Sequence, residues 1–180
     1  MSDPKPRSAY SRAEQSSRRL TLLAGAGFIS FILGSITTAG LVNRFGPLIA
    51  DSESETFVLV VTGLLQSVWV VAFLPLSGWL AGRFLGVSPW RFTLPAAVTG
   101  LAFDVLLTSA VFGAESLFAG WPEAALSAVL IATGVGLTLL AVREGLRAYE
   151  ATLAQALAVA EANRPAYKAF TNANEPPKTD

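Results

Sequence analysis

The sequence predicts an all-α membrane protein: a four-transmembrane-helix antiparallel bundle, with both termini in the cytoplasm and the fourth helix extended there. Three observations lead to this prediction. Hydrophobic residues make up 52% of the 180 residues and charged residues only 14%, whereas soluble domains carry about 25% charged residues. The apolar residues form four blocks that are too long for a soluble core, and the mean hydropathy is +0.51. Lys and Arg also gather in alternate connecting segments.

Each apolar block has the length of a helix that crosses a membrane. Crossing about 30 Å of hydrocarbon at about 1.5 Å per residue takes roughly 20 residues. The first block is too long for the apolar part of a signal peptide, which runs about 7 to 15 residues. A membrane domain is therefore expected over 20–145, with spans at about 20–42, 56–82, 92–114 and 124–142.

The positions of Lys and Arg predict the orientation of these spans. Every basic residue except Arg44 lies in the N-terminal tail (1–19), in the connection between spans two and three, or after span four. Because basic segments stay on the cytoplasmic side, both termini are expected in the cytoplasm, most simply at a bacterial inner (cytoplasmic) membrane. Within the tail, the capping-box spacing of Ser11 and Glu14 predicts a short interfacial helix.

Small residues recur at four-residue spacing in three of the spans. In lipid, helices associate through small residues that let their backbones approach closely. We expect these rows to face the inside of a compact bundle, although a row can also meet a helix of another chain. The rows are Ala26, Ser30 and Gly34 in span one, Ala96 and Gly100 in span three, and Ala128, Ala132 and Gly136 in span four.

Two prolines lie within the predicted spans. Pro75 is in the cytoplasmic half of span two, where its missing N–H and its ring predict a kink. Pro95 is in the first turn of span three, where a missing N–H has little cost.

Asp104 is the one ionisable residue in the four spans. A charge at mid-membrane costs at least about 2.5 to 3.5 kcal/mol on insertion scales, so a neutral or hydrogen-bonded carboxyl is expected. Gln66, Thr133 and Ser35 are near the same depth, and together the four side chains form a predicted polar centre. Asp104 has three interpretations: an interhelical clamp, a partner for a group on another subunit, or a proton or cation site.

The fourth helix is predicted to continue beyond the membrane as a cytoplasmic amphipathic helix over 143–163. Apolar residues there recur at alternating steps of three and four, which is typical of a helix-docking face. That face is expected to bind another chain, to fold back on the cytoplasmic loop, or to lie on the membrane surface. Pro165 is expected to end the helix before a flexible tail at 164–180. The candidate docking residues are Leu146, Tyr149, Leu153, Ala156 and Ala160.

The sequence holds no Cys and no His. Disulfides, thiolate nucleophiles and His-dependent catalytic triads are thereby excluded within this chain. The zero net charge and the small polar portion argue against nucleic-acid binding. We therefore expect a protein that is not an enzyme and that has no cofactor or metal.

The function predicted from these features is that of a non-catalytic integral membrane subunit, or a scaffold or assembly protein. It would act through helix–helix contacts in the lipid bilayer, as a homo-oligomer or within a larger membrane complex. The alternative is a small oligomeric proton or cation transporter or channel that uses Asp104.

Overall fold

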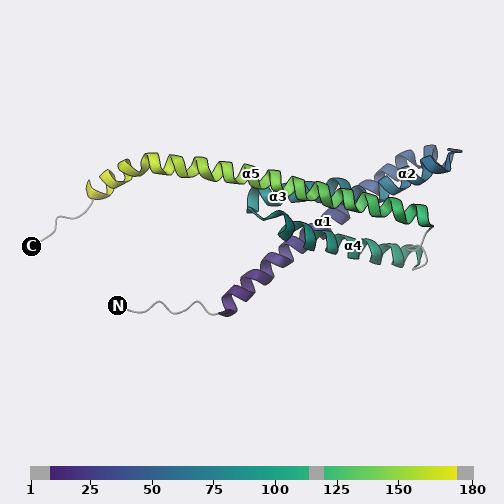
Figure 1. Cartoon of the computed structure of the whole chain (residues 1–180), viewed down its shortest axis with the longest axis horizontal. Helices are drawn as coiled ribbons and strands as arrows, with labels where there is room; N and C mark the ends of the chain where they lie inside the picture. The colour runs from purple at the N-terminus through teal and green to yellow at the C-terminus, as the bar shows by residue number, and fades with distance from the viewer. Residues whose placement is uncertain (1–8, 114–119, 174–180) are drawn as a thin grey trace, which may run out of the picture.

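The computed structural model describes residues 9–113 and 120–173, and within these ranges the chain contains helices and short connections but no strand (Figure 1). The predicted all-α class is confirmed for this part of the chain. The predictions for residues 1–8, 114–119 and 174–180 lie outside it. The elements are α1 (Ala9–Ala50), α2 (Glu55–Gln66), the π-helical turn η1 (Trp69–Phe73), α3 (Leu74–Leu85), α4 (Pro89–Phe112) and α5 (Trp121–Ala173).

Three helices in the described residues are long and apolar enough to cross a membrane. They are Thr21–Ala50 of α1, Pro89–Phe112, and Trp121–Arg164 of α5. The remaining predicted span corresponds to a bent pair, Glu55–Gln66 and Trp69–Leu85, whose two parts meet at 48°. There are thus three such helices, or four if the bent pair is one span.

The first helix is longer than its predicted span. The segment with capping-box spacing is the beginning of α1 itself and not a separate interfacial helix, and α1 continues past residue 42 and through Pro47 to Ala50. It ends where the N–H of Asp51 donates to the Pro47 carbonyl at 3.0 Å. A continuous helix satisfies its backbone groups internally, which favours this form in a bilayer.

The bend in the second span, at residues 67–68 between its two helical parts, lies about two turns before the predicted Pro75 kink. Pro75 has no N–H, so the carbonyl four residues earlier loses its usual helical donor. The preceding turn widens into η1, where the N–H of Leu74 donates to the Trp69 carbonyl five residues back. Nearby, the Thr38 hydroxyl of α1 donates to the Leu65 carbonyl at 2.6 Å and fixes the end of α2.

The most extensive contact in the fold joins α3 to α5. Its α3 face carries Gly78 and Gly82, and its α5 face carries Val142 and Gly145. A Cβ added at Gly145 would lie 2.8 Å from the Arg83 backbone nitrogen and closer still to the Trp79 carbonyl oxygen. The two backbones therefore touch, which is how helices pack without a hydrophobic driving force between them.

The connection between α3 and α4 is short because two residues fix its shape. Gly86 adopts a left-handed conformation, with φ at 60°, and its N–H donates to the Gly82 carbonyl at 3.2 Å. This is the usual glycine end of a helix. Pro89 then occupies the first position of α4, where a fixed φ suits the helix.

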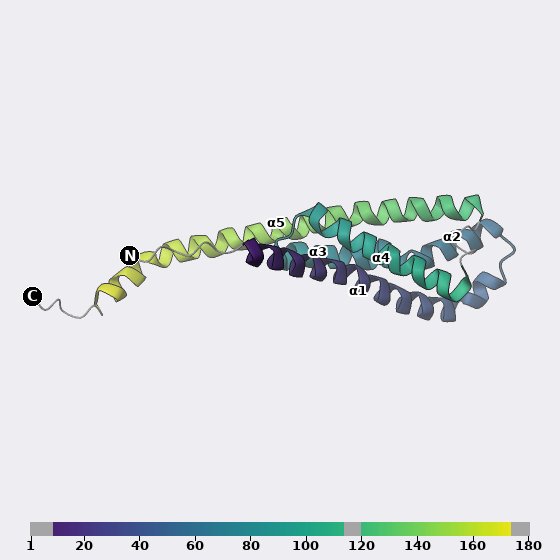
Figure 2. The same ribbon diagram turned by 90° about the horizontal axis from the view of Figure 1, so that it is seen from below.

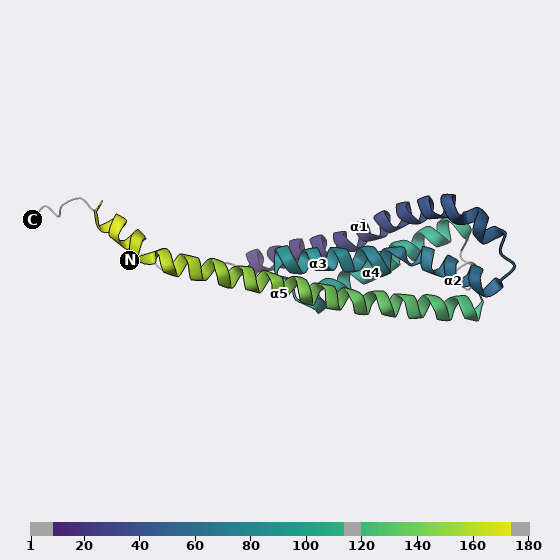
Figure 3. The same ribbon diagram turned by 90° about the horizontal axis from the view of Figure 1, so that it is seen from above.

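Figures 2 and 3 show that the Ala9 end of α1 and the Ala173 end of α5 extend toward the same end of the molecule, with the α1–α2 connection at the other. α5 does not end at Pro165 as predicted but continues to Ala173. The last turns leave the line of the preceding helix, which is how a helix accommodates an internal proline. The buried apolar core is made of Leu23, Phe31, Trp69, Val70, Leu74, Ala81, Phe92, Ala96, Ala97 and Val142.

Candidate functional site: a cleft beside Asp104

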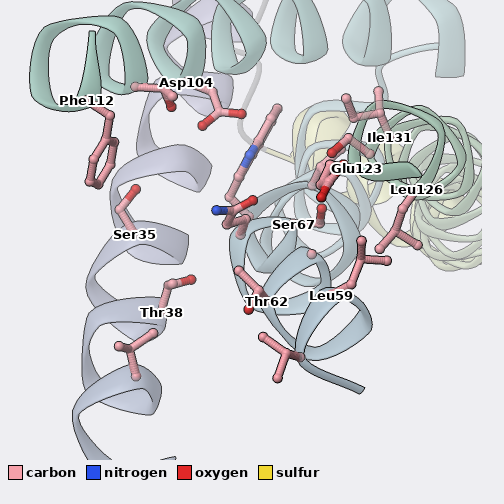
Figure 4. Close-up of a pocket in the computed structure, with 18 of the residues that line it drawn as sticks. Ser35, Thr38, Leu59, Thr62, Ser67, Asp104, Phe112, Glu123, Leu126 and Ile131 are labelled. Carbon is pink, nitrogen blue, oxygen red and sulfur yellow. The ribbon is translucent and has the colours of Figure 1, made fainter. Parts of the chain in front are cut away.

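An open cleft of about 1450 Å³ lies between α1, α2, α4 and α5. Figure 4 shows Asp104 pointing into it from α4, opposite Ser35 and Thr38 on α1 and Thr62 on α2. α2 meets the following helical segment at 48° and packs against α1 and α5, and it forms one wall of the cleft. The cleft extends from Asp104 to the α1–α2 connection, where Ser52 and Glu53 line it.

Trp69 holds the Asp104 carboxyl at the inner end of the cleft. Its indole N–H donates a side-chain hydrogen bond to that carboxyl, and the Trp69 side chain is itself only 3% exposed. A Cβ added at Gly100 would overlap the indole ring, and one added at Gly34 would overlap the Trp69 backbone. The Phe31 ring contacts the indole edge to face at 6.0 Å.

The structure brings three of the four predicted polar-centre residues to the cleft. Asp104, Gln66 and Ser35 line it, and the Ser35 hydroxyl also donates to the Phe31 carbonyl at 2.9 Å. Thr133 is exposed elsewhere on α5, and its hydroxyl donates to the Val129 carbonyl at 2.8 Å. The neighbouring Gly134, not Thr133, faces the interior.

The small-residue rows of α1 and α4 face inward. Ser30, Gly34, Ala96 and Gly100 are buried, and Ala26 is half-buried against the core. The Ser30 hydroxyl also lies 2.8 Å from the Ser77 hydroxyl of α3, a polar link that sequence reasoning missed.

The row expected on the fourth span lies on the opposite face of its helix. Ala128 and Ala132 are exposed, and a Cβ added at Gly136 would meet nothing within 4 Å. The inward face of α5 instead carries Gly134 and Thr138, two residues out of step. Two residues correspond to about 200° around a helix. Gly134 takes the inward place because a Cβ there would lie 2.5 Å from the Val70 carbonyl oxygen.

The predicted docking residues divide into two groups. Leu146 and Tyr149 are half-buried and contact α3 within the chain, with the Tyr149 ring against Gly86. The Arg83 guanidinium holds this part of α5 by donating to the Ala148 carbonyl and, at 2.6 Å, to the Thr152 hydroxyl. Beyond that point the predicted docking residues Leu153, Ala156 and Ala160 are exposed.

Sequence reasoning also missed Trp69. The signal in the sequence was the position of Trp69 near the middle of a predicted span, because Trp is usually enriched at the membrane–water interface. A buried indole N–H normally has a hydrogen-bond partner. A Trp near the middle of a predicted span therefore points to a polar partner at the same depth, which here is Asp104.

The cleft carries negative charge without positive charge. Glu53, Glu55 and Glu123 line its wider part, and none of the described lining residues is Lys or Arg. In residues 9–113 and 120–173, no group of three or more His, Cys, Asp or Glu side chains is close enough to hold a metal ion. The arrangement offers one carboxyl at the inner end and scattered carboxyls toward the opening.

Comparison with protein families, with curated proteins and with solved structures finds no match to this chain.

Proposed function

We propose that the chain is a non-catalytic integral membrane subunit, or a scaffold for assembly, that acts through helix–helix contacts with other chains in the bilayer. The observation that carries this proposal is α5, which has two kinds of contact surface that the described residues leave uncovered. One lies along its membrane part and the other along its C-terminal extension.

The membrane surface is the row of Ala128, Ala132 and Gly136. Inside the chain, surfaces of this kind are where helices meet, as at Gly82 and Gly145. Lipid tails gain nothing from packing against small residues, whereas a second helix can approach closely there. A helix of another chain, either a second copy or another subunit, is the occupant that suits this row.

The second surface is the exposed part of α5 beyond Thr152. At about 1.5 Å per residue the 53 residues of α5 extend about 80 Å, far more than the roughly 30 Å of hydrocarbon. Residues 151–164 are all exposed, and they include Leu153 at 48% and Leu157 at 58%. Apolar side chains on a projecting helix are typical of a docking face for a partner helix.

The arrangement of the helices supports the orientation proposed for the chain. If the bent pair is one span, four spans alternate in direction as an antiparallel bundle. Arg83 and Arg91 flank the α3–α4 connection, at the end toward which the described ends of α1 and α5 extend. Because basic residues stay inside, we place both termini in the cytoplasm and the protein in a bacterial inner membrane.

Ending the chain after Thr152 should remove the partners that dock on the C-terminal extension of α5 without weakening the membrane domain. The deletion keeps both hydrogen bonds of Arg83 and removes a segment whose described residues 153–164 are exposed. Co-purification from native membranes measures partner binding, and the unfolding midpoint measures stability. A chain ending after Ala173 is the matched control and should retain its partners. Retention of all partners by the shorter chain would contradict the docking role.

The cleft favours a second candidate function, a small oligomeric proton or cation transporter or channel that uses Asp104. A carboxyl at membrane depth marks ion or proton paths in many membrane proteins. Here it lies at the inner end of a cleft that begins near the α1–α2 connection. An assembled oligomer would supply the rest of the route.

Under this second candidate, Asp104→Asn should abolish proton or cation flux into proteoliposomes. Asn keeps the size of the side chain and an acceptor for the Trp69 indole, so normal folding is expected, but it binds neither a proton nor a cation as a carboxylate does. Glu144→Gln is the control, because it removes an exposed carboxylate of α5 that does not line the cleft. Undiminished flux in the Asn variant would reject the transport role of Asp104.

A further inference from the structure

We propose that the cleft beside Asp104 binds an amphiphilic organic cation. The positive group would lie at the Asp104 carboxylate, and the apolar body would lie along the walls formed by Phe112, Leu59 and Leu126. The inference rests on the cleft that the second candidate function uses, and it names the ligand class for that site.

The shape and walls of the cleft suit a ligand with a sizeable apolar part. This cleft, at about 1450 Å³, is larger than the pockets of about 300 to 1,000 Å³ that hold drug-sized ligands, so it has room for such a ligand. Phe112 is 74% exposed and lines the cleft, and Figure 4 shows its ring on the same side as Ser35. An exposed aromatic ring offers both an apolar contact and a face that attracts cations.

The charges of the cleft select the sign of the ligand. Carboxyls line the cleft at both ends, and the described lining contains no basic side chain. An anion would be repelled by these carboxylates, whereas a cation can pair with the Asp104 carboxylate and so stabilise its ionised form in a medium where an unpaired charge is costly. A hard metal ion needs several oxygen ligands at once, and the carboxyls described here are too far apart to provide them. An organic cation with one positive charge needs only one carboxylate as its partner, and Asp104 provides it.

Trp69 acts as a positioning residue for the carboxylate. One indole N–H occupies a single acceptor site of Asp104, whereas an ionised carboxyl has about four. Because Trp69 is packed between Gly34 and Gly100, the carboxyl is held in place while the rest of its acceptor capacity stays available. Figure 4 shows the Asp104 side chain directed into the cleft.

The test is equilibrium binding of tetraphenylphosphonium to the purified full-length protein in lipid nanodiscs. Tetraphenylborate, nearly identical in shape but negative, is the matched probe. Binding to empty nanodiscs is subtracted for each ion, because the lipid itself takes up hydrophobic ions and prefers the anion. After subtraction we expect saturable binding of the phosphonium at about one ion per chain and no saturable binding of the borate. Asp104→Asn should weaken phosphonium binding at least about tenfold, and Phe112→Ala by about threefold. Glu144→Gln should leave it unchanged.

Equal protein-dependent binding of the two ions, or unchanged phosphonium affinity in the folded Asn variant, would overturn the proposal. The flux assay separates this failure from failure of the second candidate function. Flux that needs Asp104 without phosphonium binding would reject the ligand class and retain transport. Asp104-dependent binding without flux would retain the site and reject transport.

Discussion

Replacing Trp69 with alanine is expected to lower the free energy of unfolding by about 3 to 5 kcal/mol, the range for large aromatic side chains removed from a packed interior. Trp69 is 3% exposed and contacts both α1 and α4. The Gly34 backbone and Gly100 form the space around it, and the Phe31 ring covers its edge. Alanine would leave this space empty and would also remove the donor to Asp104.

Reversible unfolding in mixed detergent micelles measures this loss. Trp121→Ala is the matched control, because the Trp121 side chain is 85% exposed and should change stability by no more than about 0.5 kcal/mol. Trp69→Phe separates packing from hydrogen bonding: it keeps most of the ring and should cost about 1 kcal/mol for the lost donor. Equal effects of the two alanine substitutions would contradict the central position of Trp69.

Gly145→Ala should also destabilise the fold, by about 1 to 3 kcal/mol. The added methyl group would overlap the Trp79 carbonyl and lie 2.8 Å from the Arg83 backbone nitrogen. Both are backbone atoms of α3 and cannot move aside as a flexible side chain can. The helices would therefore separate along their most extensive contact.

Gly136→Ala is the control on the same helix, because a Cβ there meets nothing within 4 Å. Alanine favours a helix over glycine by about 1 kcal/mol, so this variant should equal or exceed the wild type in stability. The same chemical change is thus expected to have opposite signs at two positions nine residues apart. Loss of stability at both positions would contradict the orientation of α5 described here.

The features that the sequence predicted best depend on composition and local spacing. Long uncharged blocks require helices in lipid, and the described part of the chain is helical. The inward faces of α1 and α4 follow from isolated small residues among large ones, as at Ser30 and Gly34. Asp104 was conspicuous because a charge in such a segment is costly.

The features that the sequence did not predict depend on contacts between helices. α5 has small residues on two faces, so spacing alone could not decide between Ala132 and Gly134. That choice depends on the Val70 carbonyl, which approaches Gly134 only because η1 places it there. The bend near Gln66 combines the missing donor of Pro75 with the Thr38 hydrogen bond to Leu65. Pro75 is a local signal of a kink, but the hydrogen bond from Thr38 joins two helices and has no local signature.

The most direct test of the proposed subunit role is the native mass of the protein released gently from its own membrane. A single chain has a mass of 18.9 kDa. The proposal predicts a larger complex, with further copies or other subunits in fixed ratio, and cross-links from the exposed α5 row to another chain. A single chain accompanied only by lipid, in mild detergent and in nanodiscs alike, would contradict it.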